Sequence, residues 1–484
     1  AVLEYGKATL TWFEFDFRRV SIVKELLIYD IIKRKGLHKK VGRMKMKRRQ
    51  DRNQGGLAFR FMKGLVNFFR SYRRWSNKGF VAVLLLAVAL SMGLVLLFES
   101  FQGMPLTSQK RDTISQEGTK QKSQEQEEEK SARIMANGDL LYHDGLFFSA
   151  KKEDGTYDFH ENFEYVTPWL KQADLAIGDF EGTINKDHYL AGYPLFNAPA
   201  EVMDAIKDAG YHVLDLAHNH ILDSQIEGVI STADIIEKAG ITPIGVYTHE
   251  PRDQAPLVIK EVNGIKVALL AYSYGFNGIE QYISQEDYNR YLSDLNEDKM
   301  KAEIERAEKE ADITIIMPQM GVEYRLEPTE EQKALYHKMI DWGADIIFGG
   351  HPHVVEPSET VEKDGEKKLI IYSMGNFISN QRIESMGDEE NAKWTERGVL
   401  MDVTIKKKDG KTTIGTAKAH PTWVNRTPKG TFSPEGYPLY HYQTYILEDF
   451  IDGGSHRDQL DEATKERIDT AYKEMNEHVG LKWD

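Results

Sequence analysis

The feature that most constrains this chain is an uncharged apolar run at residues 79–98, GFVAVLLLAVALSMGLVLLF. A run of this length can cross a lipid bilayer as a helix, whereas helices in soluble cores seldom lack a polar face over such a distance. Residues 33–78 contain 17 basic residues and one acidic residue, Asp51, while Glu99 opens an acidic flank. The positive-inside rule therefore predicts a single-pass signal anchor in the cell membrane, with residues 1–78 as a basic cytoplasmic segment and the C-terminal domain extracellular.

The charge of the chain is unevenly distributed along its length. Residues 1–78 contain 21 Lys and Arg against 6 Asp and Glu, so the rest must carry about −29 to give the total of −14. A basic segment beside a membrane helix is typical of contact with lipid head groups, so the membrane is a predicted partner and nucleic acid is not. The absence of cysteine excludes disulfides and thiol chemistry, which fits the surface of a Gram-positive bacterium. Residues 1–43 precede Met44, and we expect them to extend the natural start.

The remainder divides into a linker, a folded domain and an extension. Residues 99–130 are predicted to be a disordered linker, because residues 107–130 contain no aliphatic side chain except Ile114 and cannot bury enough surface to fold. In residues 131–425 short apolar runs alternate with amphipathic segments, which is typical of an α/β layer fold. Residues 426–484 are predicted to be a C-terminal extension whose amphipathic helix, at residues 459–479, packs back on the domain.

Strands and helices are expected to alternate through the folded domain. The predicted strands are 132–136, 175–178, 213–217, 243–246, 256–262, 265–272, 313–317, 345–348 and 369–373. The predicted helices are 200–209, 225–239, 298–311 and 329–342. Two further strands at 399–406 and 412–420 are expected to form a hairpin that turns at Asp409 and Gly410.

The string IIFGGHPHVVEP places two histidines directly after a buried strand. Gly349 and Gly350 are expected to let the backbone turn sharply, and Pro352 fixes φ between His351 and His353. The two imidazoles can then converge on one point at the carboxyl edge of a sheet. A histidine pair alone is more often a surface or hydrogen-bonded feature, so the pair must be read together with the other strand ends.

Four predicted strand ends carry side chains of the types that can bind metal ions. They read Asn137-Gly138-Asp139, Gly178-Asp179-Phe180-Glu181-Gly182, His218-Asn219-His220 and His351-Pro352-His353. In an open α/β sheet the loops at the carboxyl ends of the strands gather on one side, so these groups are expected to share a pocket. A mixed set of oxygen and nitrogen ligands suits a borderline divalent ion such as Mn²⁺, Zn²⁺ or Fe²⁺.

The same strings carry a resemblance to a known family. The ordered motifs MANGDLL, GDFEGTI, LDLAHNHILD, MGVEYRLEPTEEQ, GADIIFGGHPHVVEP and IIYSMGNF are similar to those of the CapA/PgsA family of poly-γ-glutamate capsule synthesis proteins. The resemblance covers residues 134–377. It implies a layered, calcineurin-like metallophosphoesterase β-sandwich flanked by helices and preceded by one transmembrane helix.

The resemblance also assigns site residues by their positions in these motifs. It implies that the metal ligands are Asp139, Glu181, Asn219, His351 and His353. His220 corresponds to a histidine that protonates a leaving group or steadies phosphoryl oxygens; a role as a hydrogen-bond donor behind the ligands is the alternative. Relatives commonly carry His-Trp-Gly where this chain has Gln319, and glutamine is a poorer ligand than imidazole for a borderline ion.

Three further residues are candidates for the same pocket. Asp179 lies two residues from Glu181 and would project to the same side of an extended segment, as a ligand or as a turn carboxylate. His143 would compensate for the missing histidine ligand, although a surface histidine is the simpler reading. Asn376 closes another strand and is expected to line the pocket.

The favoured interpretation is a membrane-anchored extracellular component of poly-γ-glutamate synthesis and export that uses a divalent metal. Its expected partners are the membrane, other capsule synthesis subunits and the anionic polymer. The chain has no GxxxxGK[ST] motif, so energy for ligation would come from those subunits. A metal-dependent surface phosphoesterase or hydrolase is the second reading. A non-catalytic scaffold with a degenerate metal site is the third, because of Gln319.

Overall fold

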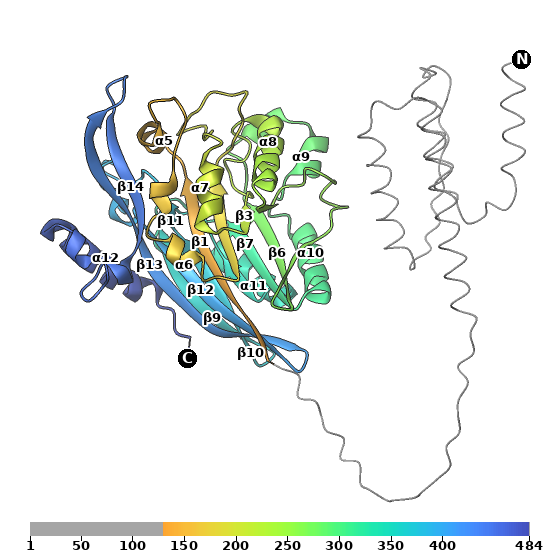
Figure 1. Cartoon of the computed structure of the whole chain (residues 1–484). Helices are drawn as coiled ribbons and strands as arrows, with labels where there is room; N and C mark the ends of the chain where they lie inside the picture. The colour runs from red at the N-terminus through yellow and green to blue at the C-terminus, as the bar shows by residue number, and fades with distance from the viewer. Residues whose placement is uncertain (1–128, 484) are drawn as a thin grey trace, which may run out of the picture. The chain divides into compact units, whose positions relative to one another are not determined.

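The computed structural model describes residues 129–483, which form two β-sheets packed face to face with helices on both outer faces (Figure 1). The predicted α/β class and the predicted sandwich are confirmed. The predicted anchor at residues 79–98 and the linker before residue 129 lie outside the described residues. Within residues 129–483, none of the helices is both long enough and apolar enough to cross a bilayer.

The first sheet is built around four parallel strands. Its strand order is β14-β13-β12-β1-β2-β3-β4, and the short strand β11 also pairs with β1. The bounds are β1 Lys130–Leu141, β2 Leu175–Glu181, β3 Val213–Asp215, β4 Thr242–Ile244, β11 Asn376–Ile378, β12 Arg397–Lys408, β13 Lys411–Phe432 and β14 Pro438–Ile446. Strands β1 to β4 are parallel, whereas β12, β13 and β14 extend the sheet as antiparallel hairpins. The carboxyl ends of β1, β2 and β3 therefore meet at one edge.

The second sheet has a parallel centre and antiparallel borders. Its order is β5-β6-β7-β8-β10-β9. The bounds are β5 Val258–Val262, β6 Ile265–Ser273, β7 Ile313–Gln319, β8 Ile346–Phe348, β9 Val355–Lys363 and β10 Glu366–Met374. Strands β6, β7, β8 and β10 are parallel, and β5 and β9 pair antiparallel at the two borders.

Helices cover the outer face of each sheet. The α-helices are α5 Asp144–Ala150, α6 Thr167–Leu170, α7 Val202–Ala209, α8 Gln225–Lys238, α9 Gln285–Tyr291, α10 Glu297–Glu310, α11 Glu330–Trp342 and α12 Glu462–Val479. The 3₁₀ segments are η1 His160–Phe163, η2 Ile279–Tyr282, η3 Ala392–Trp394, η4 Leu447–Asp449 and η5 Arg457–Gln459. Helices α5 to α8 contribute to the core of the first sheet, and α10 and α11 to that of the second.

Alternation of side chains along the strands produces the layers. In β6, Val267 and Leu269 point into the core between the two sheets, while Ala268 and Leu270 point toward α10 and α11. Apolar side chains therefore occupy both faces of such a strand. Their burial holds together four layers, in the order helices, sheet, sheet and helices.

Most predicted elements are present, with shifted ends. All nine predicted strands of the domain, the hairpin of β12 and β13 and the four predicted helices occur. Strands β9, β11 and β14 and helices α5, α6 and α9 were not predicted. The sequence of β9, VEPSETVEK, is polar and carries a proline, and this strand lies at a border of its sheet.

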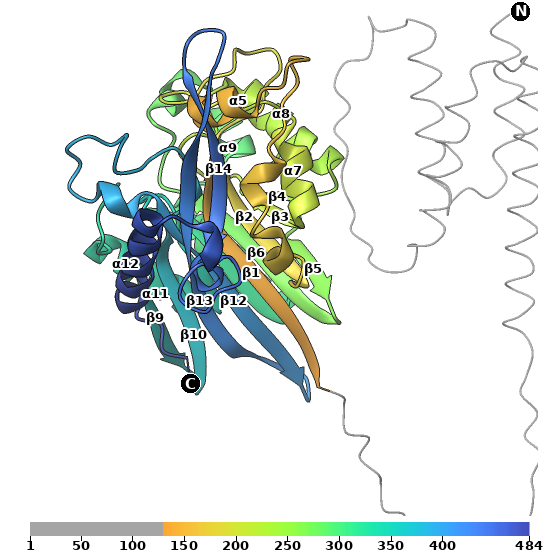
Figure 2. The same ribbon diagram turned by 60° about the vertical axis from the view of Figure 1, so that its left-hand side comes forward.

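The C-terminal part of the chain continues the same body. Strand β13 runs through residue 425, the predicted domain limit, and pairs with β14 beyond it. Helix α12 packs back as predicted, with Ile468, Ala471 and Met475 buried. Figure 2 shows α12 lying along β9, and the Oγ of Ser358 in β9 donates to the carbonyl oxygen of Val479 at 2.8 Å. The end of the chain thus covers a sheet border that would otherwise be exposed.

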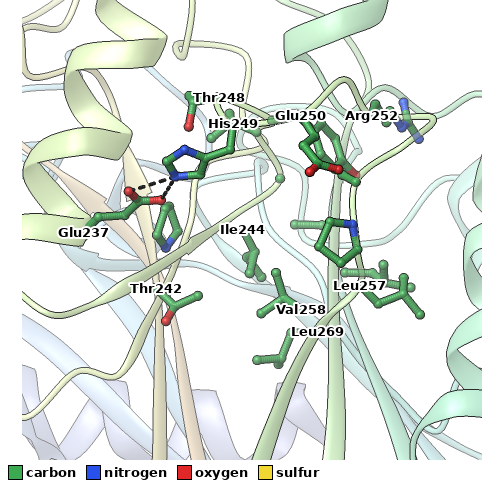
Figure 3. A pocket seen from close by; sticks show the side chains of 18 of the residues that line it. Glu237, Thr242, Ile244, Thr248, His249, Glu250, Arg252, Leu257, Val258 and Leu269 are labelled. Carbon is green, nitrogen blue, oxygen red and sulfur yellow. Dashed lines mark hydrogen bonds and ion pairs between the residues drawn. The ribbon is translucent and has the colours of Figure 1, made fainter. Parts of the chain in front are cut away.

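A cavity of about 480 Å³ lies between the borders of the two sheets, next to β4 and β5 (Figure 3). Ile244, Val258 and Leu269 line its apolar part, while Glu237 and His249 pair at its polar rim, with Nε2 of His249 2.8 Å from Oε1 of Glu237. None of the residues predicted to bind a metal lines this cavity.

An ion cluster that joins strands β12 and β13 to the 3₁₀ segment η4 predicts a pH-dependent stability. His420 in β13 lies between Glu448, 2.9 Å from its Nδ1, and Asp402, 3.5 Å from its Nε2. Burial opposes its protonation, but Asp402 and Glu448 outweigh burial and raise the pKa of His420 to about 9. Because the folded pKa lies above the unfolded value, this stabilisation is complete below pH 6.5 and is lost as pH rises toward 9.

We therefore expect the free energy of unfolding to fall by about 2 kcal/mol between pH 6.5 and 9 through this residue. Urea denaturation of the wild type and a His420→Gln variant at both pH values measures the difference. An equal pH dependence in the two proteins would contradict the assignment.

Candidate metal centre

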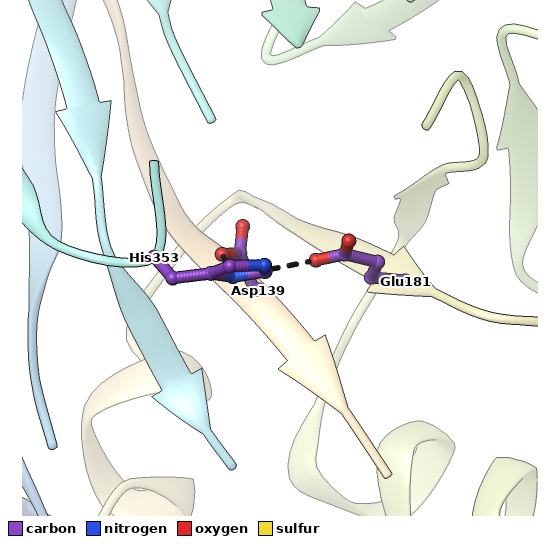
Figure 4. Close-up of side chains that lie close together, drawn as sticks. All are labelled: Asp139, Glu181 and His353. Carbon is purple, nitrogen blue, oxygen red and sulfur yellow. Dashed lines mark hydrogen bonds and ion pairs between the residues drawn. The ribbon is translucent and has the colours of Figure 1, made fainter. Parts of the chain in front are cut away.

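Three buried side chains converge at the edge where the parallel strands end. Asp139 comes from β1, Glu181 from β2 and His353 from the turn after β8, and one ligand atom of each lies within 4.8 Å of the others (Figure 4). The Nδ1 of His353 is 2.8 Å from Oδ2 of Asp139 and 3.8 Å from Oε2 of Glu181. Three of the five predicted ligands are thus brought together.

Close backbone packing sets the position of Asp139. Strand β1 continues through Gly138, where a Cβ atom would lie 2.0 Å from the carbonyl oxygen of Gly375. The N–H of Asp139 donates to that same carbonyl oxygen at 3.1 Å, and Asp139 is paired in register with Asn376 of β11. Only glycine at position 138 allows the two segments to approach this closely.

The turn after β8 places the two histidines in an unusual backbone conformation. Both His351 and His353 have positive φ, at 99° and 57°. The prediction that Gly349 and Gly350 supply the sharp turn is wrong, because the left-handed residues are the histidines themselves. Gly349 instead allows close packing, since a Cβ there would lie 2.0 Å from the carbonyl oxygen of Tyr372. Backbone conformations of this kind in non-glycine residues concentrate at functional sites.

Burial and mutual charge shift the pKa of these groups strongly. Burial raises the pKa of Glu181 to about 7, against the influence of His353. For His353 burial opposes protonation, but Glu181 and Asp139 raise its pKa to about 10. Burial together with the charge of His353 lowers the pKa of His351 to about 3. A neutral imidazole at His351 has the protonation state that a metal ligand requires.

Unsatisfied polar atoms mark the same edge. Five predicted residues contribute buried atoms without a hydrogen-bond partner: Oδ1 of Asp139, Oδ1 of Asp179, both carboxylate oxygens of Glu181, Oδ1 of Asn219 and Nδ1 of His351. Buried polar atoms in native proteins are almost always paired, and an ion is one of the few partners that can satisfy several at once. Carboxylate, amide and imidazole atoms in this number fit a divalent cation.

Asn219, Gln319 and Asp179 lie together beside this group. Oε1 of Gln319 accepts from the N–H of Asn219 at 3.4 Å, and its Nε2 donates to Oδ2 of Asp179 at 3.2 Å. Gln319 thus joins β2 to the segment that follows β3, with both ends of its amide engaged within the protein. A Cβ at Gly350 would lie 3.1 Å from Oδ2 of Asp179 and 3.5 Å from Oδ1 of Asp139, which places Asp179 at the centre as well.

The remaining predicted residues take distinct positions. The ring of His351 lies 6.2 Å from that of His353 and packs on Tyr274 at 4.5 Å, outside the group of three. Oδ1 of Asn376 is 3.2 Å from Nδ1 of His353. His143 is also outside the group: its Nδ1 accepts from the N–H of Asn380 at 3.3 Å. His143 is half-buried, which differs from the surface position that the simpler reading gave it.

His220 is buried next to the centre and is oriented by Asp223. The two atoms Nδ1 of His220 and Oδ2 of Asp223 are 2.7 Å apart, and the ring packs edge-on against Phe196 at 4.7 Å. Burial opposes protonation of His220, but Asp223 and Glu181 raise its pKa above the usual value.

Sequence reasoning missed Asp215, Asp223, Asn277 and Tyr274. Asp215 ends β3 beside Asp179 in the register, and burial raises its pKa to about 8. Asp215 could have been recognised as a single carboxylate inside an apolar strand. Asp223 could have been recognised by its spacing of three residues from His220. Asn277 and Tyr274 lie in the loop after β6, and no pattern in the sequence distinguished them from other loop residues.

The fold and these residues define a four-layer α/β protein with a candidate divalent-metal centre at its parallel strand ends. The sequence profile of the family described as bacterial capsule synthesis protein PGA_cap matches residues 133–381. This chain belongs to that family, and the predicted resemblance is confirmed.

Two Bacillus proteins are among its relatives. The capsule biosynthesis protein CapA of Bacillus anthracis is 33% identical over 228 residues, which cover 45% of this chain and 54% of that protein. The PGA biosynthesis protein CapA of Bacillus subtilis is 30% identical over 224 residues, covering 45% and 57%. The chain thus spans about half the length of these relatives.

Solved structures show a more distant likeness. The calcineurin-like phosphoesterase YfkN from Bacillus subtilis matches at 15% identity with a TM-score of 0.38, covering 61% of this chain and 91% of that one. A likeness at this distance assigns no activity to this chain.

Proposed function

We propose that this chain is a surface-anchored component of poly-γ-glutamate capsule synthesis whose extracellular domain, of the metallophosphoesterase type, holds a divalent ion. The observation that carries the proposal is the convergence of Asp139, Glu181 and His353, with unpartnered buried atoms, inside the region that matches the capsule family. The names of the two CapA relatives supply the pathway. Other subunits of the capsule synthesis pathway would act as partners of this chain and would supply the energy for ligation.

Membrane anchoring is part of the proposal and is supported by the apolar run and the charge step that precedes it. Strand β1 begins at Lys130, and Asp139 lies near its other end. Nine residues of extended strand separate the two, or about 30 Å at the usual rise per residue. The predicted linker would thus join the domain at the end of β1 that lies away from the metal centre.

The donor set defines what the centre can do. Asp139, Glu181, Asn219, His351 and His353 would hold the ion, which as a Lewis acid polarises a bound oxygen of a substrate or of water. Asp179 and Gln319 brace the loops beside these groups. His220, held by Asp223, can hold or deliver a proton at Nε2.

A metal-dependent surface phosphoesterase is the second candidate. The paired His220 and Asp223 favour it, because a buried histidine oriented by a carboxylate beside a metal centre suits proton transfer to a leaving group. Release of phosphate from phosphomonoesters by the wild type, and its loss in His220→Gln, would select this candidate.

Complementation tests the leading proposal. A strain that lacks the chain is complemented with the wild type, with Asp139→Asn or with Asn289→Ala, an exposed control. We expect surface and released poly-γ-glutamate to be restored by the wild type and the control and not by Asp139→Asn. Unchanged polymer in the deleted strain would overturn the role in capsule synthesis, whereas full restoration by Asp139→Asn would overturn the role of the centre.

A further inference from the structure

A chain of polar contacts runs from Asp223 to the amide of Asn219. Nδ1 of His220 is 2.7 Å from Oδ2 of Asp223. Nδ2 of Asn277 is 3.3 Å from Nδ1 and 3.5 Å from Nε2 of the same histidine. Oδ1 of Asn277 then accepts from Nδ2 of Asn219 at 3.2 Å. Asn277 therefore stands between the histidine and a predicted metal ligand.

The chemistry of each group fixes the direction of this chain. Asp223 orients Nδ1 of His220 as a donor, so Nε2 is the acceptor of the neutral ring. The N–H of the Asn277 amide can then donate to Nε2, 3.5 Å away, so that its oxygen accepts from Asn219. Asn219 must present its Nδ2 to that oxygen, which leaves its Oδ1 free.

The oxygen that this arrangement leaves free is an atom that can bind a cation. Oδ1 of Asn219 is buried and has no hydrogen-bond partner, as is true of the carboxylate oxygens of Glu181. An amide turned the other way would point Nδ2, a donor, at the centre and could not bind a cation.

The backbone of Asn277 has an unusual conformation. Its φ is 54°, in the left-handed region, and it follows the buried Phe276 in the loop after β6. Asparagine tolerates this conformation better than most side chains. The residue itself is exposed at the rim, so its side chain can be changed without opening the core.

We propose that Asn277 is a positioning residue that turns the amide of Asn219 so that Oδ1 faces the divalent ion. The inference rests on the proposed metal centre and adds a residue outside the ligand set. Asn277 works through Asn219 and does not itself touch the ion.

The test measures Mn²⁺ affinity of the full chain, purified in detergent, by isothermal titration calorimetry. Asn277→Gly keeps the left-handed backbone but removes the amide, and we expect it to weaken binding about 10-fold, as is usual when a group that orients a ligand is removed. Asn277→Asp keeps an acceptor for Nδ2 of Asn219 and is expected to bind at least as tightly as the wild type. Asn289→Ala serves as an exposed control that leaves affinity unchanged.

The outcomes separate this inference from the metal centre itself. Equal affinity of Asn277→Gly and the wild type overturns the positioning role, and so does an equal loss in Asn277→Gly and Asn277→Asp. Absence of binding by the wild type overturns the proposed centre and the inference with it. Thermal melting without metal shows whether each variant folds, and an equal melting temperature assigns a lost affinity to the amide.

Discussion

Replacement of Glu181 by glutamine is expected to lower Mn²⁺ affinity about 100-fold or more while leaving the metal-free protein no less stable. Removal of groups that merely orient ligands costs 10- to 100-fold in affinity, and loss of a ligand charge should reach at least the upper end. Stability without metal should be kept because the cost of burying a carboxylate without a hydrogen-bond partner offsets its ion pair with His353 at 3.8 Å. Calorimetry and thermal melting of the full chain measure the two quantities.

The combination of results makes this prediction specific. An ordinary structural carboxylate would lose stability on replacement, whereas this variant should lose only the stabilisation that added metal gives the wild type. That stabilisation is about 2.7 kcal/mol at a free ion concentration 100 times Kd. The matched control is the same substitution at Glu305, Glu305→Gln, because Glu305 is partly exposed and lies on helix α10, outside the metal centre. Metal binding retained by Glu181→Gln would exclude this carboxylate as a ligand.

The sequence predicted the strand ends that carry the site because parallel strands have a simple geometry. Asp139 and Glu181 each close an apolar run, and such ends must meet at one edge of the sheet. The position of His353 was predictable for the same reason, since it follows β8 in the second sheet. Its contact with Asp139, by contrast, depends on how the two sheets face each other, which no local pattern encodes.

The features that were missed depend on contacts between distant segments. Strand β11 has three residues and exists because Asn376 pairs in register with Asp139, 237 positions earlier. Strand β9 has a polar sequence, and it contacts helix α12 through Ser358 and Val479, which are 121 positions apart. Asn277 lies in the loop after β6, and its contacts are with Asn219 and His220, which follow β3. The positive φ of His351 and His353 likewise comes from the packing around the turn and could not be read from the residue types.

Replacement of Arg252 by alanine is expected to lower the free energy of unfolding by about 3–5 kcal/mol, the usual cost of removing one partner from a buried ion pair. Its side chain is 1% exposed and pairs with Asp294 at 2.5 Å and Glu303 at 2.9 Å, beside the cavity of Figure 3. The guanidinium also lies 5.6 Å from the centre of the Tyr272 ring. Alanine would leave two carboxylates in a poorly solvated place without a cation.

A second variant separates the lost charge from the lost packing. Arg252→Met combined with Asp294→Asn and Glu303→Gln fills similar volume and removes all three charges, so we expect it to recover most of the stability lost in Arg252→Ala. Lys301→Ala, an exposed cation on helix α10, should change stability by less than about 1 kcal/mol. Urea denaturation followed by tryptophan fluorescence measures all four proteins.

Because the cluster ties the loop at Arg252 to α10 and not to the metal centre, Mn²⁺ affinity should stay unchanged under native conditions. A loss in Arg252→Ala no larger than that in Lys301→Ala would show that the carboxylates are well solvated without their cation.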